Sequence, residues 1–374
     1  MADNLQIFRV SCEGGLNTNR DVLSQGELFP GTGIRMINYE PSVTGGYRRI
    51  NGYEESYTSL PGTGATLGVC VVNNVNDGIL ACRKPSSGNN YLHYWDNATS
   101  AWVAVTTSGS PTMTGVSKVR FHKYNWSADE VIMVDGVNPA ATYDGTTYTQ
   151  ITHANAPTNP RYVTTFKSNM FFAGASASLN SLYFSAPLDE TDFSVANGAG
   201  EINVGFDIVQ IKPFRDELYI FGTNNIKKLV GNSVADFQLL QVTNDLGCIA
   251  SDSVVELGGD LLFVGPDGLR PVAGTDRIGD VNLETISKNV QSVFNDIVIN
   301  QDLDALSTVL IRQKSQFRMF FAASESQGVI GALRQQQSGG IAFEFGQLFG
   351  ITATCADSGY IGQNEFVIHG DSSG

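Results

Sequence analysis

The C-terminal residues are the segment of this chain most suggestive of chemistry. Residues 370–374 are Gly-Asp-Ser-Ser-Gly, which has the form of a serine-protease nucleophile segment around Ser372. A serine nucleophile needs a histidine base and an orienting acid, and no matching histidine signature occurs in the sequence. Asp, Ser and Gly are also turn-forming residues. We therefore interpret this ending as a turn and predict no catalytic residue.

Histidines and cysteines are the next candidates, as metal ligands or redox groups. They are His93, His122, His153 and His369, and Cys12, Cys70, Cys82, Cys248 and Cys355. None shows C-x-x-C or i, i+4 ligand spacing. The odd number of cysteines argues against a disulfide framework, and we expect Cys70 and Cys82 to be buried free thiols. The sequence predicts no metal site.

The stretch 62–68, Gly-Thr-Gly-Ala-Thr-Leu-Gly, has the glycine content of a phosphate-binding loop. It precedes a predicted strand rather than a helix, so it lacks the structural context of such a loop. We interpret it as a flexible entry into the first repeat and predict no cofactor. The acidic pairs 129–130 and 189–190 lie in turn-like segments, where solvation explains them without general acid and base catalysis.

These residues must be positioned by a repeat of about 45 residues, a period typical of propellers and solenoids. Each repeat contains short apolar runs separated by turn residues, at 70–105, 118–151, 162–204 and 208–240. A fifth repeat contains 253–264, a sixth contains 308–321 and a partial seventh opens at Ile351. Asp135-Gly136 and Asp144-Gly145 are strong hairpin signals because tight primed turns need positive φ.

The repeats predict an all-β fold, a β-propeller of six to seven four-stranded blades. Forty glycines and only 16% charged residues agree with many turns and half-buried strands. One stretch, 283–297, has apolar residues at helical spacing and Asn282 as a possible N-cap. These apolar residues are Ile286, Val290, Val293, Phe294 and Ile297. We predict one inserted helix there, packed on a blade edge or serving as a docking helix for a partner.

The chain divides into an N-terminal segment, residues 1–60, and a propeller, residues 61–374. The last blade is either incomplete or closed by N-terminal strands at 34–38 or 47–50, which would protect both edges. The sequence shows no N-terminal apolar stretch of the signal-peptide type and no run of about 18 apolar residues. We expect synthesis in the cytoplasm and no membrane span.

Several motifs resemble phage tail proteins of the nozzle and packaged-DNA stabilisation type. They span most of the chain, at 14–18, 28–33, 38–40, 45–54, 169–174, 182–186, 192–194, 213–221, 245–250 and 263–269. The segment 45–54 is Gly-Gly-Tyr-Arg-Arg-Ile-Asn-Gly-Tyr-Glu and the segment 169–174 is Asn-Met-Phe-Phe-Ala-Gly. Relatives of this kind often continue past the point that corresponds to 370–374, so either this chain is a shortened form or the N-terminal strands close its last blade.

The resemblance implies a structural virion protein of the tail and not an enzyme. Such subunits form a ring with their own copies, commonly six, below the portal and adaptor proteins, with tail fibres or a needle attached nearby. The ring extends the DNA channel and helps to retain packaged DNA, with transient contact to passing DNA. The net charge of −14 disfavours tight binding of nucleic acid, and an acidic channel would let DNA slide.

Two alternatives remain open on the residues alone. The first is a carbohydrate-binding or glycan-degrading β-propeller that acts on the host surface. Its aromatic platform would use Tyr94, Trp95, Trp102 and Tyr148, and its nearest approach to an Asp-box turn is the segment 143–148. Alternation along the strands favours core positions for these aromatic residues. The second alternative is a cellular scaffold propeller.

Overall fold

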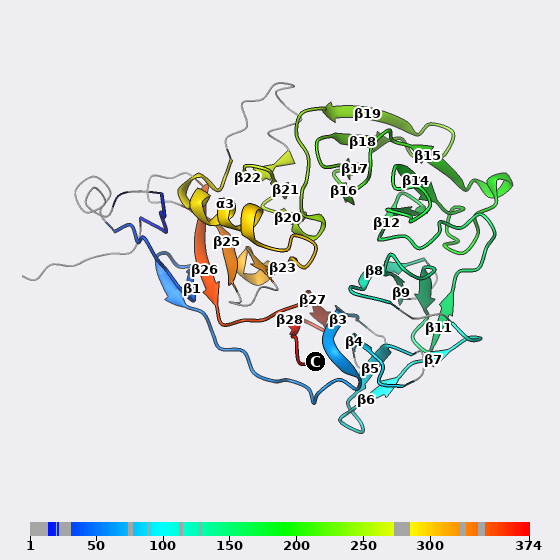
Figure 1. Cartoon of the computed structure of the whole chain (residues 1–374), viewed down its shortest axis with the longest axis horizontal. Coiled ribbons are helices and arrows are strands. Elements are labelled where there is room, and N and C mark those ends of the chain that lie inside the picture. Colours follow the sequence, from blue (N-terminus) through cyan, green and yellow to red (C-terminus); the bar gives the residue numbers. More distant parts are fainter. Residues whose placement is uncertain are drawn as a thin grey trace, which may run out of the picture.

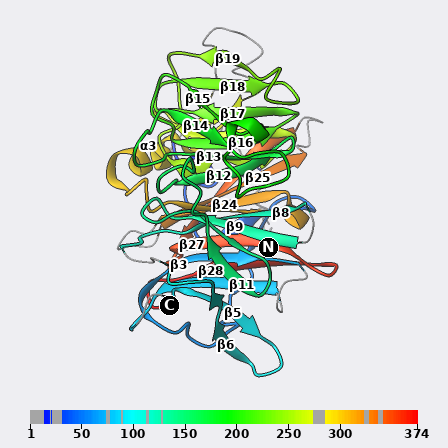
Figure 2. The same ribbon diagram turned by 90° about the vertical axis from the view of Figure 1, so that its right-hand side faces the viewer.

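Six small antiparallel sheets are arranged in a ring as the blades of a β-propeller (Figure 1). The structure is a computed structural model and describes residues 14–19, 21, 31–73, 78–87, 90–111, 115–126, 129–272, 285–321, 327–335 and 341–374. The predicted all-β propeller of six to seven blades is confirmed. Seen from the side, most strands run from one face of the ring toward the other, and they lie one above another in this view (Figure 2).

The first three blades follow one another along the chain, each with its inner strand first. Their sheet orders are β3-β4-β5-β6, β8-β9-β10-β11 with β7 added in parallel beside β11, and β12-β13-β14-β15. The strands are β3 (Thr63–Val71), β4 (Ile79–Lys84), β5 (Leu92–Asp96), β6 (Ala101–Ala104), β7 (Thr106–Thr107), β8 (Arg120–Asn125), β9 (Asp129–Val134), β10 (Ala141–Tyr143), β11 (Thr147–Gln150), β12 (Tyr162–Phe166), β13 (Asn169–Ala173), β14 (Ser181–Phe184) and β15 (Gly200–Asn203). They overlap the strands predicted in the first three repeats.

The other three blades continue the ring, with sheet orders β16-β17-β18-β19, β20-β21-β22 and β23-β24-β25-β26. The strands are β16 (Gln210–Phe214), β17 (Glu217–Phe221), β18 (Ile226–Val230), β19 (Gln238–Thr243), β20 (Val255–Leu257), β21 (Asp260–Gly265), β22 (Gly268–Pro271), β23 (Ser307–Ile311), β24 (Gln316–Phe320), β25 (Gln327–Gln335) and β26 (Ile341–Phe349). Short 3-10 helices are η2 (Val195–Asn197), η3 (Ser251–Ser253), η4 (Lys288–Val290) and η5 (Arg312–Lys314). Blade 5 shows three strands in the described part of the chain.

Burial explains why the second strand of a blade has a continuous apolar sequence. All five residues of β13 are buried, as are the last four of β17 and the last five of β21. A strand covered on both faces loses the apolar and polar alternation of a half-buried strand. Here the two covering layers are the neighbouring blades, so Phe171 packs toward blade 4 and Phe172 toward blade 2.

Tight turns between the inner and second strands agree with the sequence. Phe166 pairs with Asn169 and Phe214 pairs with Glu217, which leaves two-residue turns in both hairpins. Arg215 and Asp216 both have positive φ, as a type I′ turn requires. The predicted flexible entry at 62–68 is wrong, because β3 already begins at Thr63 and pairs with β4 through a shifted register.

A two-stranded hairpin occupies a seventh position between blade 6 and blade 1. It consists of β27 (Cys355–Ile361) and β28 (Asn364–Gly370). Two glycines let it lie close to β3: a Cβ on Gly359 would come within 3.0 Å of Val71, and one on Gly370 within 2.4 Å of Thr66. The hairpin therefore fills the gap in the ring with two strands of its own.

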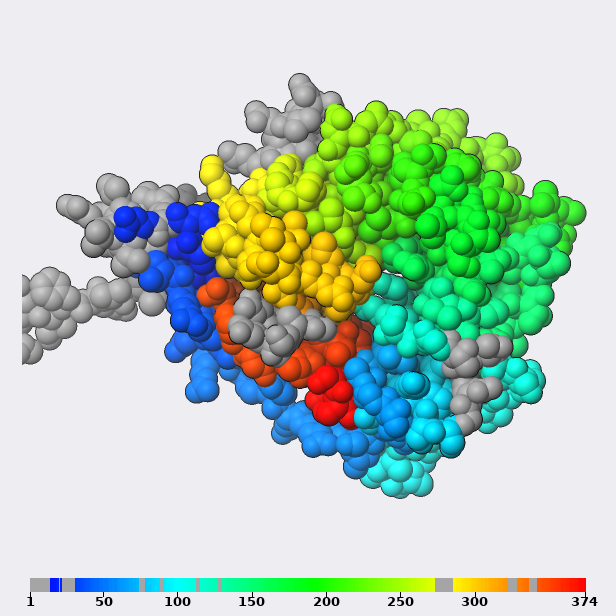
Figure 3. All heavy atoms as spheres, in the orientation of Figure 1, coloured from blue at the N-terminus to red at the C-terminus, as the bar shows by residue number. Residues whose placement is uncertain are grey.

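The N-terminal strands lie on blade 6 and do not pair with this hairpin. β1 (Tyr39–Pro41) and β2 (Tyr47–Arg49) form a separate sheet, and a parallel bridge joins Ile37 to Gln347 of β26. From β2 the segment 50–60 runs along the outside of the hairpin to β3 (Figure 1). In the space-filling view the blue N-terminal residues cover the edge of blade 6 beside α3 (Figure 3). We call residues 31–60 the arm.

The predicted helix is present as α3 (Gln291–Asn300), preceded by η4. It begins later than predicted because the residues before it are bound to blade 5: Ile286 N donates to Leu269 O, and Leu269 N donates to Ser287 Oγ. The proposed N-cap Asn282 lies outside the described residues. Phe294 and Ile297 are buried, which agrees with packing on a blade edge. Among the described residues, no helix has the length and apolar character needed to cross a membrane.

Candidate functional site

The axis of the propeller contains a cavity of about 250 Å³. All six blades contribute to its wall, each through its inner strand or the residues just before that strand, and β27 contributes as well. The lining residues are Val69, 118–123, 162–164, 210–212, Asp252, Val254, 307–308 and 355–357. Side chains that point inward from these strands meet at the axis, so charged residues far apart in the sequence are brought together there.

One ion-pair group joins blade 2 to the start of blade 5. The Arg120 guanidinium donates from Nε and Nη2 to both oxygens of Asp252, at 2.8 and 2.7 Å, and Lys118 Nζ lies 2.7 Å from Asp252 Oδ2. Burial alone would raise the pKa of Asp252, but Arg120 and Lys118 hold it well below its usual range. Bidentate pairing of this kind is strong and directional. It fixes two distant blades across the axis.

A second ion pair joins blade 2 to the hairpin. Lys123 Nζ lies 3.0 Å from Asp357 Oδ2 and also donates to Val71 O at 3.0 Å. The same carboxylate accepts a hydrogen bond from Val71 N at 2.8 Å. Burial lowers the pKa of Lys123, but Asp357 raises it above its usual value overall. The seventh position is therefore held to β3 and β8 by charge as well as by packing.

His122 and Lys212 face the same cavity without a carboxylate partner. His122 Nε2 accepts a hydrogen bond from Thr165 N at 3.0 Å, and burial with Lys212 and Lys123 lowers its pKa to about 3. The ring is therefore neutral at pH 7. Burial also lowers the pKa of Lys212. The Lys212 side chain is surrounded by the inner strands, yet it remains accessible from the cavity.

A second charged group fastens the arm to blade 6. The Glu40 carboxylate is fully buried and accepts hydrogen bonds from Arg48 at 2.9 Å, Lys314 at 2.8 Å and Arg318 at 2.9 Å. Burial raises the pKa of Glu40, but Lys314 and Arg318 lower it below its usual value overall. Arg334 Nη2 donates to the neighbouring Pro41 O at 2.8 Å. Four cations thus hold one short segment of the arm.

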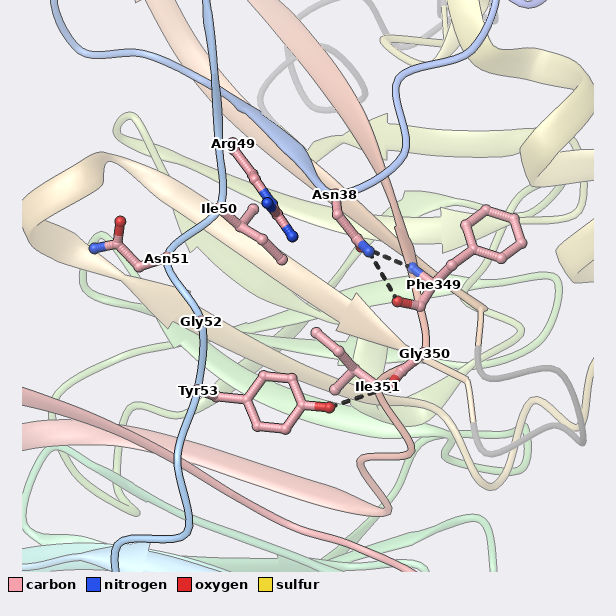
Figure 4. Close-up of a pocket in the computed structure, with 9 residues that line it drawn as sticks. All are labelled: Asn38, Arg49, Ile50, Asn51, Gly52, Tyr53, Phe349, Gly350 and Ile351. Atoms are coloured by element: carbon pink, nitrogen blue, oxygen red, sulfur yellow. Dashed lines mark hydrogen bonds between the residues drawn. The ribbon is translucent and has the colours of Figure 1, made fainter.

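A pocket of about 460 Å³ lies between the arm and the end of β26 (Figure 4). The Asn38 side chain donates to Phe349 O and accepts from Phe349 N, and Tyr53 OH donates to Gly350 O. These bonds use the polar groups of Asn38 and Tyr53 to hold the arm in place. The pocket is therefore a by-product of the docking of the arm.

The C-terminal serine lies in a turn. The Asp371 carboxylate accepts hydrogen bonds from Ser373 N and Gly374 N, each at 2.8 Å, and from Ser373 Oγ. This is the turn geometry expected from the sequence. The Asp371 carboxylate thus caps the turn formed by the residues that follow it.

The histidines and cysteines are distributed over the ring. His93 lies in blade 1, His122 in blade 2, His153 after blade 2 and His369 in the hairpin. Cys70, Cys82, Cys248 and Cys355 are free and buried, as expected for the first two, while Cys12 lies outside the described residues. In the described part of the chain, no three His, Cys, Asp or Glu side chains gather as a metal site would require.

The four aromatic candidates for a sugar platform occupy packed positions. Tyr148 and Trp95 are buried, and Tyr94 packs against the core of blades 1 and 2. Trp102 and Trp95 meet edge to face at 5.4 Å, and Tyr57 of the arm contacts both rings. Trp95 and Trp102 therefore bind the arm to blade 1 through Tyr57.

The prediction that the acidic pairs 129–130 and 189–190 lie in solvated turns is only partly correct. Asp189 accepts hydrogen bonds from Thr191 and Asp192 amides in an exposed turn. Glu190 is half-buried near Tyr124, and burial raises its pKa. The solvated-turn interpretation thus fits Asp189 and does not fit Glu190. The turn-like assignment of the pair 129–130 is wrong, because these two residues begin strand β9 and pair with β8.

The sequence analysis did not identify Glu40 or the cations that line the axial cavity. Glu40 lies in the quoted motif at 38–40, but two of its three partners, Lys314 and Arg318, are 274 and 278 residues away, so no local spacing points to them. The cations of the axial cavity had a weak signal, because Lys118 and Arg120 alternate with apolar residues in the segment 118–123, and Lys123 ends it.

No family model matches the chain, and no curated protein gives a significant match. Among solved structures it is similar to Kluyveromyces lactis Hsv2 with a complete loop 6CD, at 9% identity and a TM-score of 0.41, over 76% of this chain and 98% of that one. It is also similar to BBS1N in complex with ARL6DN, at 8% identity and a TM-score of 0.36, over 60% of this chain and 66% of that one. The class established by the structure itself is the β-propeller.

Proposed function

We propose that this chain is a structural subunit of a phage tail, of the nozzle or head-to-tail hub type. It forms a ring with copies of itself, six by the resemblance, which extends the DNA channel and helps to retain packaged DNA. Its partners in the virion are the adaptor or portal-proximal proteins and the tail fibres or needle. No catalytic role is part of this proposal.

The observation that carries the proposal is the position of the N-terminal motif at 45–54. This motif leaves the ring and fastens along its outer rim: Tyr47 OH donates to Phe345 O, Arg48 binds Glu40, and Tyr53 OH donates to Gly350 O. Other motifs of the resemblance build the blades, since 169–174 contains all of β13. The residues that carry the resemblance thus have structural roles, which supports a structural protein.

The DNA channel of the proposed ring lies between subunits. The cavity inside one propeller, about 250 Å³, is smaller than pockets that hold drug-sized ligands, so a duplex cannot pass through it. The net charge of −14 then belongs mainly to the outer surfaces. A channel bordered by such surfaces would repel phosphates and let DNA slide.

Native mass spectrometry of the purified chain over a range of concentrations tests the ring. The proposal predicts an assembly close to six times the 40.2 kDa of one chain, and negative-stain images with ring-shaped particles. A chain that stays monomeric under assembly conditions and is absent from purified virions would overturn the proposal.

A further inference from the structure

The cavity on the propeller axis has an excess of positive charge. The cations among its lining residues are Lys118, Arg120, Lys123 and Lys212, and the carboxylates are Asp252 and Asp357. His122 is neutral at pH 7 because its pKa is lowered to about 3. The side chains that line the cavity thus carry two more positive than negative charges, in a protein whose net charge is −14.

Lys212 carries the clearest part of this excess. Lys118 and Arg120 share Asp252, and Lys123 is paired with Asp357. Within the described part of the chain, the Lys212 ammonium forms no hydrogen bond and no ion pair of its own. It lies near enough to Asp357 and Glu256 for both to raise its pKa, and near enough to Arg312 for that cation to lower it. Lys212 thus faces the cavity without an ion pair of its own, and the two carboxylates act on it only from a distance.

Two neutral groups of the same wall are suited to an oxyanion. His122 Nε2 accepts the hydrogen bond from Thr165 N, so in the neutral ring the proton is on Nδ1, which is a donor. Thr308 Oγ1 is buried and has no hydrogen-bond partner. An unpartnered buried hydroxyl costs free energy, which an oxygen ligand would recover.

We propose that the cavity binds a small oxyanion of the phosphate class, with Lys212 as its principal cation and His122 and Thr308 as neutral donors. A phosphate monoester carries a charge of about −1.5 to −2 at pH 7, which is close to the excess of two positive charges among the lining side chains. A volume of about 250 Å³ admits an inorganic phosphate or a small phosphorylated molecule. The site does not depend on the proposed function, because it lies inside a single subunit.

Isothermal titration calorimetry with inorganic phosphate on the full chain tests this site. The wild type should bind one phosphate per chain saturably. Lys212→Gln should weaken binding about tenfold or more, as expected for loss of a charged hydrogen bond. Lys84→Gln is the matched control, because Lys84 is exposed on β4 and outside the cavity, and it should bind as the wild type does.

Thermal unfolding provides an independent readout that also reports folding. Phosphate should raise the Tm of the wild type and of Lys84→Gln but not that of Lys212→Gln. Thr308→Val keeps the shape of the side chain and removes the hydroxyl, so it should weaken binding severalfold even if Lys212→Gln fails to fold. No saturable binding by the wild type, or unchanged binding by both cavity variants, would overturn the proposal.

Discussion

Glu40 and Arg318 are 278 residues apart in the sequence, yet Arg318 Nη2 donates to Glu40 Oε2 at 2.9 Å. The carboxylate comes from β1 of the arm and the guanidinium from β24 of blade 6. Lys314 and Arg48 complete the group around the same buried carboxylate. This ion-pair group makes the arm part of the folded propeller, and its consequences can be measured.

Replacing Glu40 by Gln should destabilise the protein by about 3 kcal/mol, near the lower end for a broken buried ion pair. The lower end applies because Arg48 is half exposed, whereas the Glu40 side chain is fully buried. Urea unfolding followed by circular dichroism measures the change. Glu54→Gln, an exposed acid of the same arm, is the control and should lie within about 0.5 kcal/mol of the wild type.

The same group should make stability depend on acid pH. In the unfolded chain Glu40 takes up a proton near its ordinary pKa of 4.5, whereas Lys314 and Arg318 keep the folded carboxylate ionised to lower pH. Its stabilising contribution is therefore fully present above about pH 4.5 and is lost as the pH falls through the lowered folded pKa.

The difference in unfolding free energy between wild type and Glu40→Gln isolates this dependence, because Glu190 and Glu344 have raised pKa values and act in the opposite direction. The difference should shrink between pH 5 and pH 3. A difference that stays constant over this interval would show that the charge of Glu40 is not what holds the arm.

A methyl group at Gly346 should displace the arm. A Cβ there would come within 2.1 Å of Tyr39 O, a backbone atom that cannot move without shifting β1. Gly346→Ala should therefore break the bond from Asn38 N to Gln347 O, and the Asn38 amide should exchange with solvent about tenfold faster or more. In Gly52→Ala the new Cβ meets no atom within 4 Å, and hydrogen exchange at Asn38 should match the wild type.

Removing the Tyr57 ring should loosen the arm at its other end. Tyr57 lies 4.8 Å from Trp95 and 5.8 Å from Trp102, and two edge-to-face contacts contribute about 1–3 kcal/mol together. Tyr57→Ala should shift tryptophan emission to longer wavelength, because two of the three tryptophans then gain solvent. Tyr360→Ala, on the hairpin, is the control, and an equal shift there would contradict the assignment.

The sequence allowed the ring to be predicted because its signals are local. Apolar runs such as 170–173 and turns such as Asp144-Gly145 act within a few residues, and both occur where they were expected. The position of the arm was not predictable in this way. It depends on contacts such as Glu40 with Arg318 and Gly346 with Tyr39, for which no short-range pattern exists.

The start of α3 illustrates the same limit. Ser292 N donates to Asn19 Oδ1 at 3.0 Å, so the helix is capped by a residue 273 positions earlier in the chain. The sequence close to the helix predicted the cap at Asn282, because Asn is a good N-cap residue. Blades 5 and 6 were also predicted incompletely, since Gly, Arg and Pro interrupt the apolar sequence of β22, and Gly and Gln interrupt that of β25.

The proposal that this chain is a phage tail subunit is tested most directly by a map of the tail of the virion in which the chain is proposed to lie. The account predicts a ring of propellers, each fitting the six blades and the hairpin described here, around the DNA channel below the portal and adaptor. A complete tail map with no density for this propeller, together with its absence from the proteins of purified virions, would contradict the account.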